Sequence, residues 1–133
     1  MTIKKRIYSP QVTEPAEGMW SNALLVDQML FISGLTARGK NLDEVIGKDE
    51  YQQAKVVFSK IRDLVESAGG VMDDIVKMTI FVTHISENKL VWQARREFFS
   101  GDFPACTLVE VKGLARPDIL LEIEATAIVG CSG

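Results

Sequence analysis

The chain has 133 residues, of which 47% are apolar and 25% are charged, and its net charge is −3. This length suits one globular domain spanning residues 1–133, and the composition excludes a disordered or fibrous protein. The slightly acidic balance lacks the concentrated basic surface that contacts with a phosphate backbone need, so nucleic acid is not expected as a partner.

Targeting and metal signals are missing from the sequence. The basic start of the chain has no apolar signal-peptide run behind it, and no stretch reaches the roughly 20 apolar residues of a membrane span. We therefore expect a cytoplasmic protein without membrane attachment. The two cysteines, Cys106 and Cys131, form no disulfide framework, and together with the single His84 they form no metal-ligand cluster.

The N-terminal third predicts strands. Residues Lys4 to Tyr8 read as a short edge strand. Two apolar runs, Ser21 to Val26 and Met29 to Ser33, flank Asp27-Gln28, and their spacing predicts a hairpin with a two-residue turn.

A long amphipathic helix is predicted to start at the end of the loop at residues 36–50. Asp49 with Gln52 three residues later resembles a capping box, and Gly69-Gly70 supplies a stop. The apolar residues between these signals recur at helical spacing on one face: Ala54, Val57, Phe58, Ile61, Leu64, Val65 and Ala68.

The next segment predicts a strand and a second helix. Residues 71–83 read as a strand, in which Met78, Ile80 and Val82 alternate with Lys77, Thr79 and Phe81. Ser86 is a plausible N-cap for a helix that ends at Gly101. Its predicted buried residues are Val91, Ala94 and Phe98.

The stretch from Phe103 to Gly130 reads as two long strands joined by a Pro-containing turn. From Ile119 onward the residues alternate strictly, and one face is wholly apolar. The other face places Glu122 and Glu124 between apolar residues, whereas a face turned simply to water should be polar throughout. This mixed face predicts a surface that is partly covered.

These elements predict an α+β fold, in which one mixed β-sheet has two helices on a single face. The second face of the sheet is then left open. It carries apolar residues as well as charges, so we expect self-association to bury it. Sites shared between subunits would follow.

Several side chains are candidates for chemistry, each with a simpler structural reading. Cys106 is a candidate nucleophile or a small buried hydrophobe, and no activating partner is visible in the sequence. Glu122 and Glu124 are either a carboxylate pair that divides acid and base work or two solvated surface residues. Strand geometry places them about 7 Å apart.

The remaining candidates are cationic and aromatic. Arg95-Arg96 and Lys112 with Arg116 could contact an anion or be solvated charges. Trp20 and Trp92 could wall a pocket or pack, and packing is favoured for Trp92. The run SGLTARGKN at residues 33–41 lacks the spacing of phosphate-binding loops.

Taken together, the motifs of this chain resemble those of the reactive intermediate deaminase family, Rid, also called YjgF. The resemblance spans almost the whole chain and rests on the order and spacing of short segments. They are FISG at 31–34, ESAGG at 66–70, MDDIVKMTIFV at 72–82, EFF at 97–99, FPACTLVEV at 103–111 and LEIEATA at 121–127.

The resemblance implies a chorismate-mutase-like α+β subunit that forms a homotrimer with clefts between subunits. It also implies hydrolysis of small enamines and imines, such as 2-aminoacrylate, to ketoacids and ammonia without a cofactor. Matching motif to motif assigns the water-orienting role to Glu122. The same matching places Ser33, Gly34 and Trp20 along the pocket that holds the small-molecule ligand.

One position departs from the family motif. The motif reads FPAR and its Arg pairs with the substrate carboxylate, but this chain has Cys106 there. A thiol cannot replace the guanidinium fork. Either Arg116, or Arg95 or Arg96 of an adjoining subunit, takes over the anion, or the ligand is not a small carboxylate. A non-catalytic regulatory binding protein is the alternative function, and a ribonuclease or translation inhibitor is disfavoured by the acidic chain.

Overall fold

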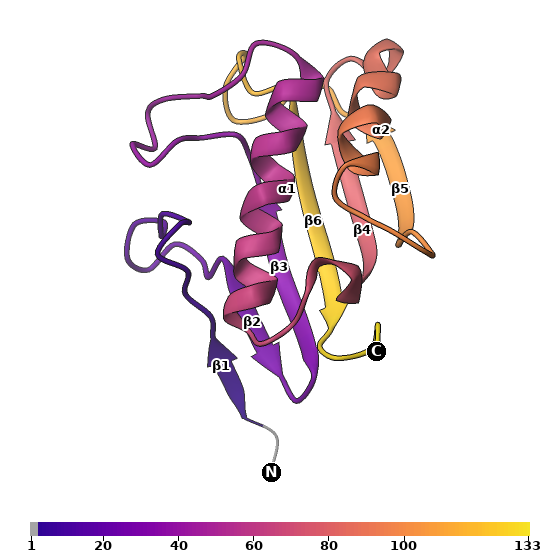
Figure 1. Cartoon of the computed structure of the whole chain (residues 1–133). Coiled ribbons are helices and arrows are strands. Elements are labelled where there is room, and N and C mark those ends of the chain that lie inside the picture. The colour runs from indigo at the N-terminus through magenta and orange to yellow at the C-terminus, as the bar shows by residue number, and fades with distance from the viewer. Residues whose placement is uncertain (1–2) are drawn as a thin grey trace.

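The computed structural model describes residues 3–133 and contains one six-stranded sheet and two α-helices (Figure 1). The strands lie in the order β1-β2-β3-β6-β4-β5. Only the pairing of β4 with β5 is parallel within this sheet. In chain order the strands are β1 Lys4–Arg6, β2 Ala23–Val26, β3 Met29–Leu35, β4 Ile75–Val82, β5 Ala105–Glu110 and β6 Leu121–Ile128.

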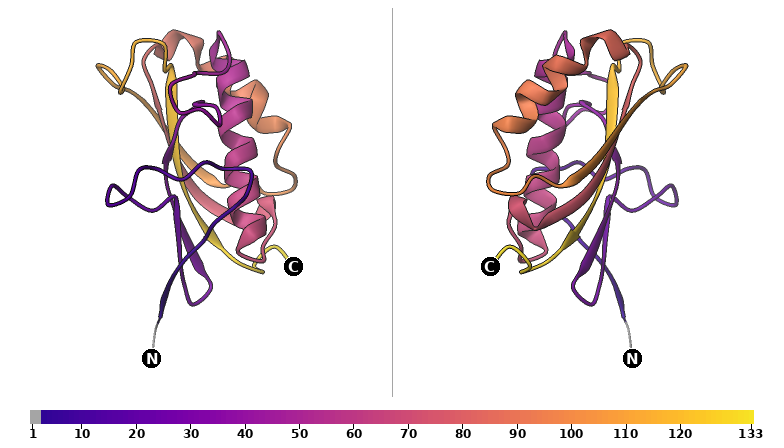
Figure 2. Two further views of the ribbon diagram at one scale, coloured as in Figure 1. Left: turned by 90° about the vertical axis from the view of Figure 1, so that its left-hand side faces the viewer. Right: turned by 90° about the vertical axis from the view of Figure 1, so that its right-hand side faces the viewer.

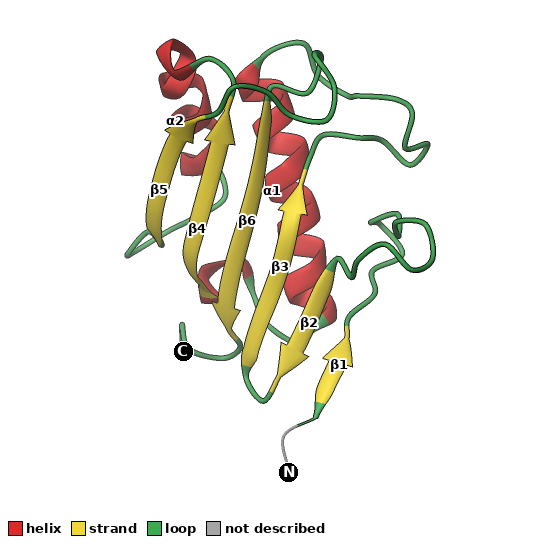
Figure 3. Ribbon diagram, turned by 180° about the vertical axis from the view of Figure 1, so that it is seen from behind, coloured by secondary structure: helices red, strands yellow, loops and turns green. Residues whose placement is uncertain are grey.

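Both helices cover the same face of the sheet, as the edge-on views show (Figure 2). Helix α1 spans Glu50–Ser67 and packs on β3 and β6, and helix α2 spans Asn88–Arg96 and packs against α1. From behind, the strands are seen with no helix in front of them (Figure 3). The predicted α+β class with one mixed sheet and helices on one face is therefore confirmed.

Helix α1 begins and ends as its sequence predicts. The Asp49 carboxylate accepts a hydrogen bond from the Gln52 amide at 2.8 Å and so satisfies one of the free amides of the first turn. The Gln52 side chain, however, accepts from the amide of Lys48 instead of closing the box onto Asp49. Gly69 ends the helix with a φ of +93°, a left-handed conformation that glycine adopts without a steric penalty.

The hairpin has the predicted two-residue turn, with Val26 opposite Met29 and Asp27 at a φ of 55°. Strand β2 begins two residues later than predicted, and β3 continues two residues further, to Leu35. The final residues of β3 therefore have no β2 partner, because the last β2–β3 pair is Ala23 with Ile32. This end of β3, which lacks a β2 partner and pairs with β6, borders the site described below.

Four further predicted boundaries were wrong. Residues Met72–Asp74 form a short 3-10 turn before β4, and β6 begins at Leu121, after Ile119. Ser86 is not an N-cap, since it lies inside a 3-10 turn at Ile85–Glu87 that leads into α2. Helix α2 ends at Arg96, before Gly101, although Phe98 still packs on Phe58 with ring centroids 5.5 Å apart.

The last two strands are not neighbours. Strand β4 lies between β5 and β6, so the connection at residues 111–120 crosses the end of β4 rather than making a tight turn. The predicted alternation of β6 is confirmed, because its core-facing residues are buried and Glu122 and Glu124 lie on the helix-free face. Large apolar side chains on that face are exposed: Met29, Phe31, Val109 and Ile128.

Candidate functional site

A cleft of about 340 Å³ opens beside the end of β3. We call it the Glu122 cleft. Its walls come from the segment before β2, the end of β3 with the loop that follows, Lys60 of α1 and Glu122 of β6. The lining residues are Val12, Thr13, Pro15, Ala16, Met19, Trp20, Asn22, Gly34, Leu35, Thr36, Arg38, Leu42, Asp43, Lys60, Ala115 and Glu122.

Glu122 places a carboxylate in this cleft. The alternation of β6 directs it away from the core, and its side chain is half-buried. Burial, and secondarily the nearby charge of Glu124, raise the pKa of Glu122 above its usual value. No hydrogen bond or ion pair ties this carboxylate to another side chain among residues 3–133. Glu122 is therefore a carboxylate that can exchange protons with a ligand.

Gly34 makes the space for that carboxylate. A Cβ atom at position 34 would lie 2.4 Å from the Glu122 Oε2 atom, closer than atoms can approach. The ladder between β3 and β6 is irregular between Ile32 and Leu35, so the backbone at Gly34 leaves the regular pleat beside Glu122. A side chain at position 34 would therefore displace the Glu122 carboxylate from this position.

Trp20 and Ser33 differ in their position relative to the Glu122 cleft. The Trp20 indole is 52% exposed and lines the Glu122 cleft as an apolar wall. The Ser33 hydroxyl donates to the carbonyl of Ser21 at 2.5 Å, and the Ser33 amide donates to the carbonyl of Asn22 at 2.9 Å. Ser33 thus fixes the segment that carries Trp20 and does not itself line the cleft.

Cys106 lies outside the cleft within one protomer. It pairs with Met78 across β4 and β5, and its side chain packs against the core on the helix-covered face. Burial raises the pKa of the Cys106 thiol, although Arg95 and Lys77 act in the opposite direction. A thiol that stays protonated at neutral pH is a poor nucleophile, so the structural reading of Cys106 is favoured.

The Arg95 guanidinium lies close to this thiol. It is 4.2 Å from the ring centroid of Trp92 and 5.4 Å from that of Phe103. Its Nε atom is buried without a hydrogen-bond partner among the described residues. Arg95 therefore supplies a cation beside the motif position that lacks one.

Arg116 is engaged at the rim of the cleft. Its guanidinium donates to both carboxylate oxygens of Asp118, at 3.0 and 2.8 Å, and to the carbonyl of Asp43. Because Ala115 and Asp43 line the cleft, Arg116 holds two of its segments together. The bidentate pair with Asp118 leaves its guanidinium less available to a ligand.

Two cations in the cleft, Arg38 and Lys60, were not among the predicted site residues. Lys60 lies on α1 next to the buried Ile61 and one turn after the buried Val57. Its side chain therefore starts at the border between the buried face and the exposed face of the helix. A lysine bordering the apolar face of a helix was a signal that could have drawn attention to it. Arg38 lies in the loop after β3, and no local pattern marks it.

Among residues 3–133, no group of three or more His, Cys, Asp and Glu side chains is placed to hold a metal ion. None of the helices in this part of the chain is long and apolar enough to cross a membrane.

The fold and the cleft define a small α+β domain with a carboxylate on the helix-free face of its sheet. Residues 11–129 match the family described as Endoribonuclease L-PSP. A RutC family protein from Pyrococcus abyssi is 29% identical over 124 residues, which span 93% of this chain and 96% of that protein.

Solved structures agree with this match. A protein of unknown function from Pseudomonas aeruginosa superimposes with a TM-score of 0.88 at 39% identity, covering 98% of this chain and 95% of that one. YyfA from Yersinia pestis, described as a conserved Rid family protein, superimposes with a TM-score of 0.86 at 31% identity over 96% of this chain and all of that one. The chain belongs to the Rid family, also called YjgF or L-PSP, and the predicted family is confirmed.

Proposed function

We propose that this protein hydrolyses imines and enamines to carbonyl compounds and ammonia, without a cofactor, in the Glu122 cleft. Membership of the Rid family supports a general role related to imine and enamine deamination. The observation that carries the proposal is Glu122 itself. It is a half-buried carboxylate with a raised pKa, and no side chain of residues 3–133 forms a hydrogen bond or ion pair with it. A carboxyl group whose pKa lies nearer neutrality serves better as both base and acid.

In the proposed mechanism an enamine is first protonated on carbon by solvent, which gives the iminium ion. The Glu122 carboxylate then takes a proton from water as the water oxygen bonds to the iminium carbon and the C=N π electron pair moves to nitrogen, which gives a neutral carbinolamine. The Glu122 carboxyl group passes this proton to the amine nitrogen of the carbinolamine. The C–N bond then breaks and ammonia leaves, while the hydroxyl oxygen loses its proton to water and the carbonyl forms. Imines already hydrolyse in water, so positioning and proton transfer suffice.

The substrate range is proposed to differ from that of members with the FPAR motif. The thiol of Cys106 cannot form the bidentate contact of a guanidinium with a carboxylate. Arg95 is the cation placed beside Cys106 and supplies the best replacement, since Arg116 is paired with Asp118.

A homotrimer with sites between subunits is part of the proposal. Met29 and Phe31 of β3 and Ile128 of β6 expose between 38% and 44% of their surface on the helix-free face. Burying such a face against another copy would remove this apolar surface from water. Assembly would also allow the Cys106 and Arg95 region of one subunit to complete the Glu122 cleft of another. A monomer in light scattering would contradict this part.

A non-catalytic regulatory trimer that binds a small molecule is the second candidate. The thiol of Cys106, whose pKa is raised, stands where the family motif has a permanent positive charge, and this observation favours it. Such a protein would bind a ligand in the Glu122 cleft but would not accelerate its hydrolysis.

The test generates 2-aminoacrylate in situ from serine with a dehydratase and follows its conversion to pyruvate with and without the protein. Acceleration that is lost in Glu122→Gln and kept in Glu124→Gln supports the hydrolase. Glu124 is the matched control because it lies on the same face of β6 but outside the cleft. No acceleration by the wild type or by Cys106→Arg favours the binding protein.

A further inference from the structure

A second cavity adjoins the Glu122 cleft. It has a volume of about 270 Å³ and lies between α1 and the loop that follows β3. We call it the basic pocket, and it is lined by Gln11, Thr13, Arg38, Gly39, Lys40, Ile46, Val56, Ser59, Lys60 and Asp63. Thr13, Arg38 and Lys60 line both cavities, so the two are neighbouring compartments on one wall.

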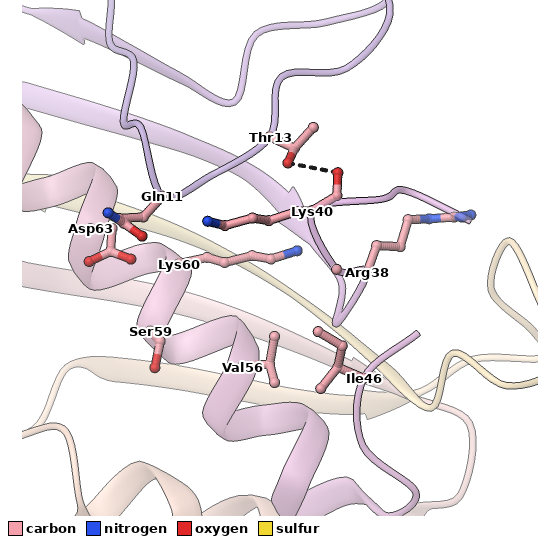
Figure 4. Close-up of a pocket in the computed structure, with 10 residues that line it drawn as sticks. Gln11, Thr13, Arg38, Lys40, Ile46, Val56, Ser59, Lys60 and Asp63 are labelled. Atoms are coloured by element: carbon pink, nitrogen blue, oxygen red, sulfur yellow. Dashed lines mark hydrogen bonds between the residues drawn. The ribbon is translucent and has the colours of Figure 1, made fainter. Parts of the chain in front are cut away.

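Three cations line the basic pocket, with one acidic residue, Asp63. In Figure 4 the side chains of Lys40 and Lys60 extend from opposite directions, one from the loop and one from α1, while Arg38 extends away from them. One guanidinium nitrogen of Arg38 donates to the carbonyl of Leu42, which lines the Glu122 cleft, at 2.7 Å. The positive charges therefore span the boundary between the two compartments.

None of these three cations forms an ion pair with another residue of the described chain. Lys60 is partly buried and donates a hydrogen bond only to the carbonyl of Thr36, at 2.6 Å. Burial, and secondarily the charge of Arg38, lower the pKa of Lys60 to about 8. Partial burial and the positive charge of Arg38 both disfavour the charged form of the Lys60 amine. An anionic group of a ligand would relieve that cost.

We propose that the ligand of the Glu122 cleft carries a distal carboxylate or phosphate group, which Arg38, Lys40 and Lys60 bind while the opposite end of the ligand faces Glu122. The inference rests on the proposed function for the identity of the end that reacts. It names the substrate class as imines or enamines with a second anionic group. Deamination of such a molecule yields an oxo acid that keeps the distal anion.

The experiment measures binding by titration calorimetry at pH 7, below the pKa of Lys60, and needs no turnover. The probes are 2-oxoglutarate and 2-oxopentanoate, which have the same carbon chain and differ in the distal carboxylate. The wild type is expected to bind 2-oxoglutarate about 10-fold more tightly, as one charge-assisted contact provides. Inorganic phosphate is added as a competitor to decide whether the basic pocket also accepts a phosphate group.

Three variants assign the effect. Lys60→Met and Arg38→Gln should each abolish the preference, and the readout is the ratio of the two affinities rather than the affinity for 2-oxopentanoate alone. Lys55→Met is the matched control, because Lys55 lies on the same helix but over the ring of Tyr51 and outside both cavities. Thermal unfolding of each variant shows that it is folded, and Lys40→Gln, at an exposed loop residue, repeats the test without altering α1.

Equal binding of the two oxo acids together with no competition by phosphate would overturn the inference, as would an unchanged preference in Lys60→Met and Arg38→Gln. A preference for 2-oxoglutarate, or competition by phosphate, that these variants remove supports it. If the protein fails to accelerate imine hydrolysis but shows this preference, only the proposed function is lost and the anion site stands.

Discussion

Two acidic residues of this fold have opposite environments. Asp74 is buried beside the C-terminus and accepts hydrogen bonds from the amides of Val71, Gly130 and Ser132 and from the Ser132 hydroxyl. Burial acts to raise the pKa of Asp74, but these donors outweigh it and lower that pKa to about 2. Glu122 is also partly buried but has no such donors, and its pKa is raised.

The difference separates a structural carboxylate from one that is available for chemistry. The charge of Asp74 is fully satisfied by the protein, so it holds the C-terminal residues against the turn that precedes β4. The charge of Glu122 is left to solvent or a ligand, which costs stability but permits proton transfer. Removing the charge of each residue by mutation tests this distinction.

The largest effect is expected from Glu122→Gln on imine hydrolysis. An amide keeps the shape of the side chain but cannot accept the proton from water, so the rate acceleration should fall about 100-fold or more. The rate of pyruvate formation from 2-aminoacrylate measures it, with Glu124→Gln unchanged. Full activity in Glu122→Gln would remove Glu122 from the mechanism.

Asp74→Asn should reduce stability and leave catalysis alone. An amide nitrogen would face donors that now meet a carboxylate oxygen, so the free energy of unfolding should fall by about 1–3 kcal/mol. Urea denaturation measures this, with the exposed Asp102→Asn as control. An equal loss in both variants would show that the hydrogen-bond cluster contributes nothing specific.

The lowered pKa of Asp74 also predicts that the free energy of unfolding depends on pH. Since the folded-state pKa of Asp74 is about 2 and its ordinary pKa is 3.8, its stabilising contribution is complete above about pH 4. It is lost as the pH falls towards 2. The difference in unfolding free energy between wild type and Asp74→Asn should therefore shrink over this window, and a constant difference would contradict the assignment.

Cys106→Arg should increase activity towards 2-aminoacrylate by about 10-fold, because a guanidinium can pair with the substrate carboxylate. Cys106→Ser is the matched control, since it keeps the size without the charge. No gain in the arginine variant, with the fold intact, would mean that Arg95 already serves this role or that the ligand is bound elsewhere.

The smallest effect is a stability gain from Glu122→Gln at neutral pH. Because the folded-state pKa of Glu122 is raised, its ionised form costs stability as the pH rises above the pKa of the unfolded chain. The Gln variant should melt at a higher temperature than the wild type at pH 7 and at the same temperature in acid. A lower melting temperature at pH 7 would contradict the unsatisfied state of Glu122.

Local patterns in the sequence determined the elements and their inward faces. The capping signal at Asp49, the stop at Gly69 and the alternation of β6 each depend on interactions between residues close in the chain, so they could be read directly. The carboxylate of Glu122 on the helix-free face followed from the same period of two. The short turns before β4 and α2 could not be predicted, since packing of their neighbours decides them.

Only the tertiary structure decided which candidates share a site. Strand order placed β4 between β5 and β6, which separates Cys106 from Glu122 although both belong to one stretch of sequence. Arg38 and Lys60 reach the Glu122 cleft because a loop and a helix pack beside the end of β3. Such arrangements depend on contacts between residues that are distant in the chain, which no local period encodes.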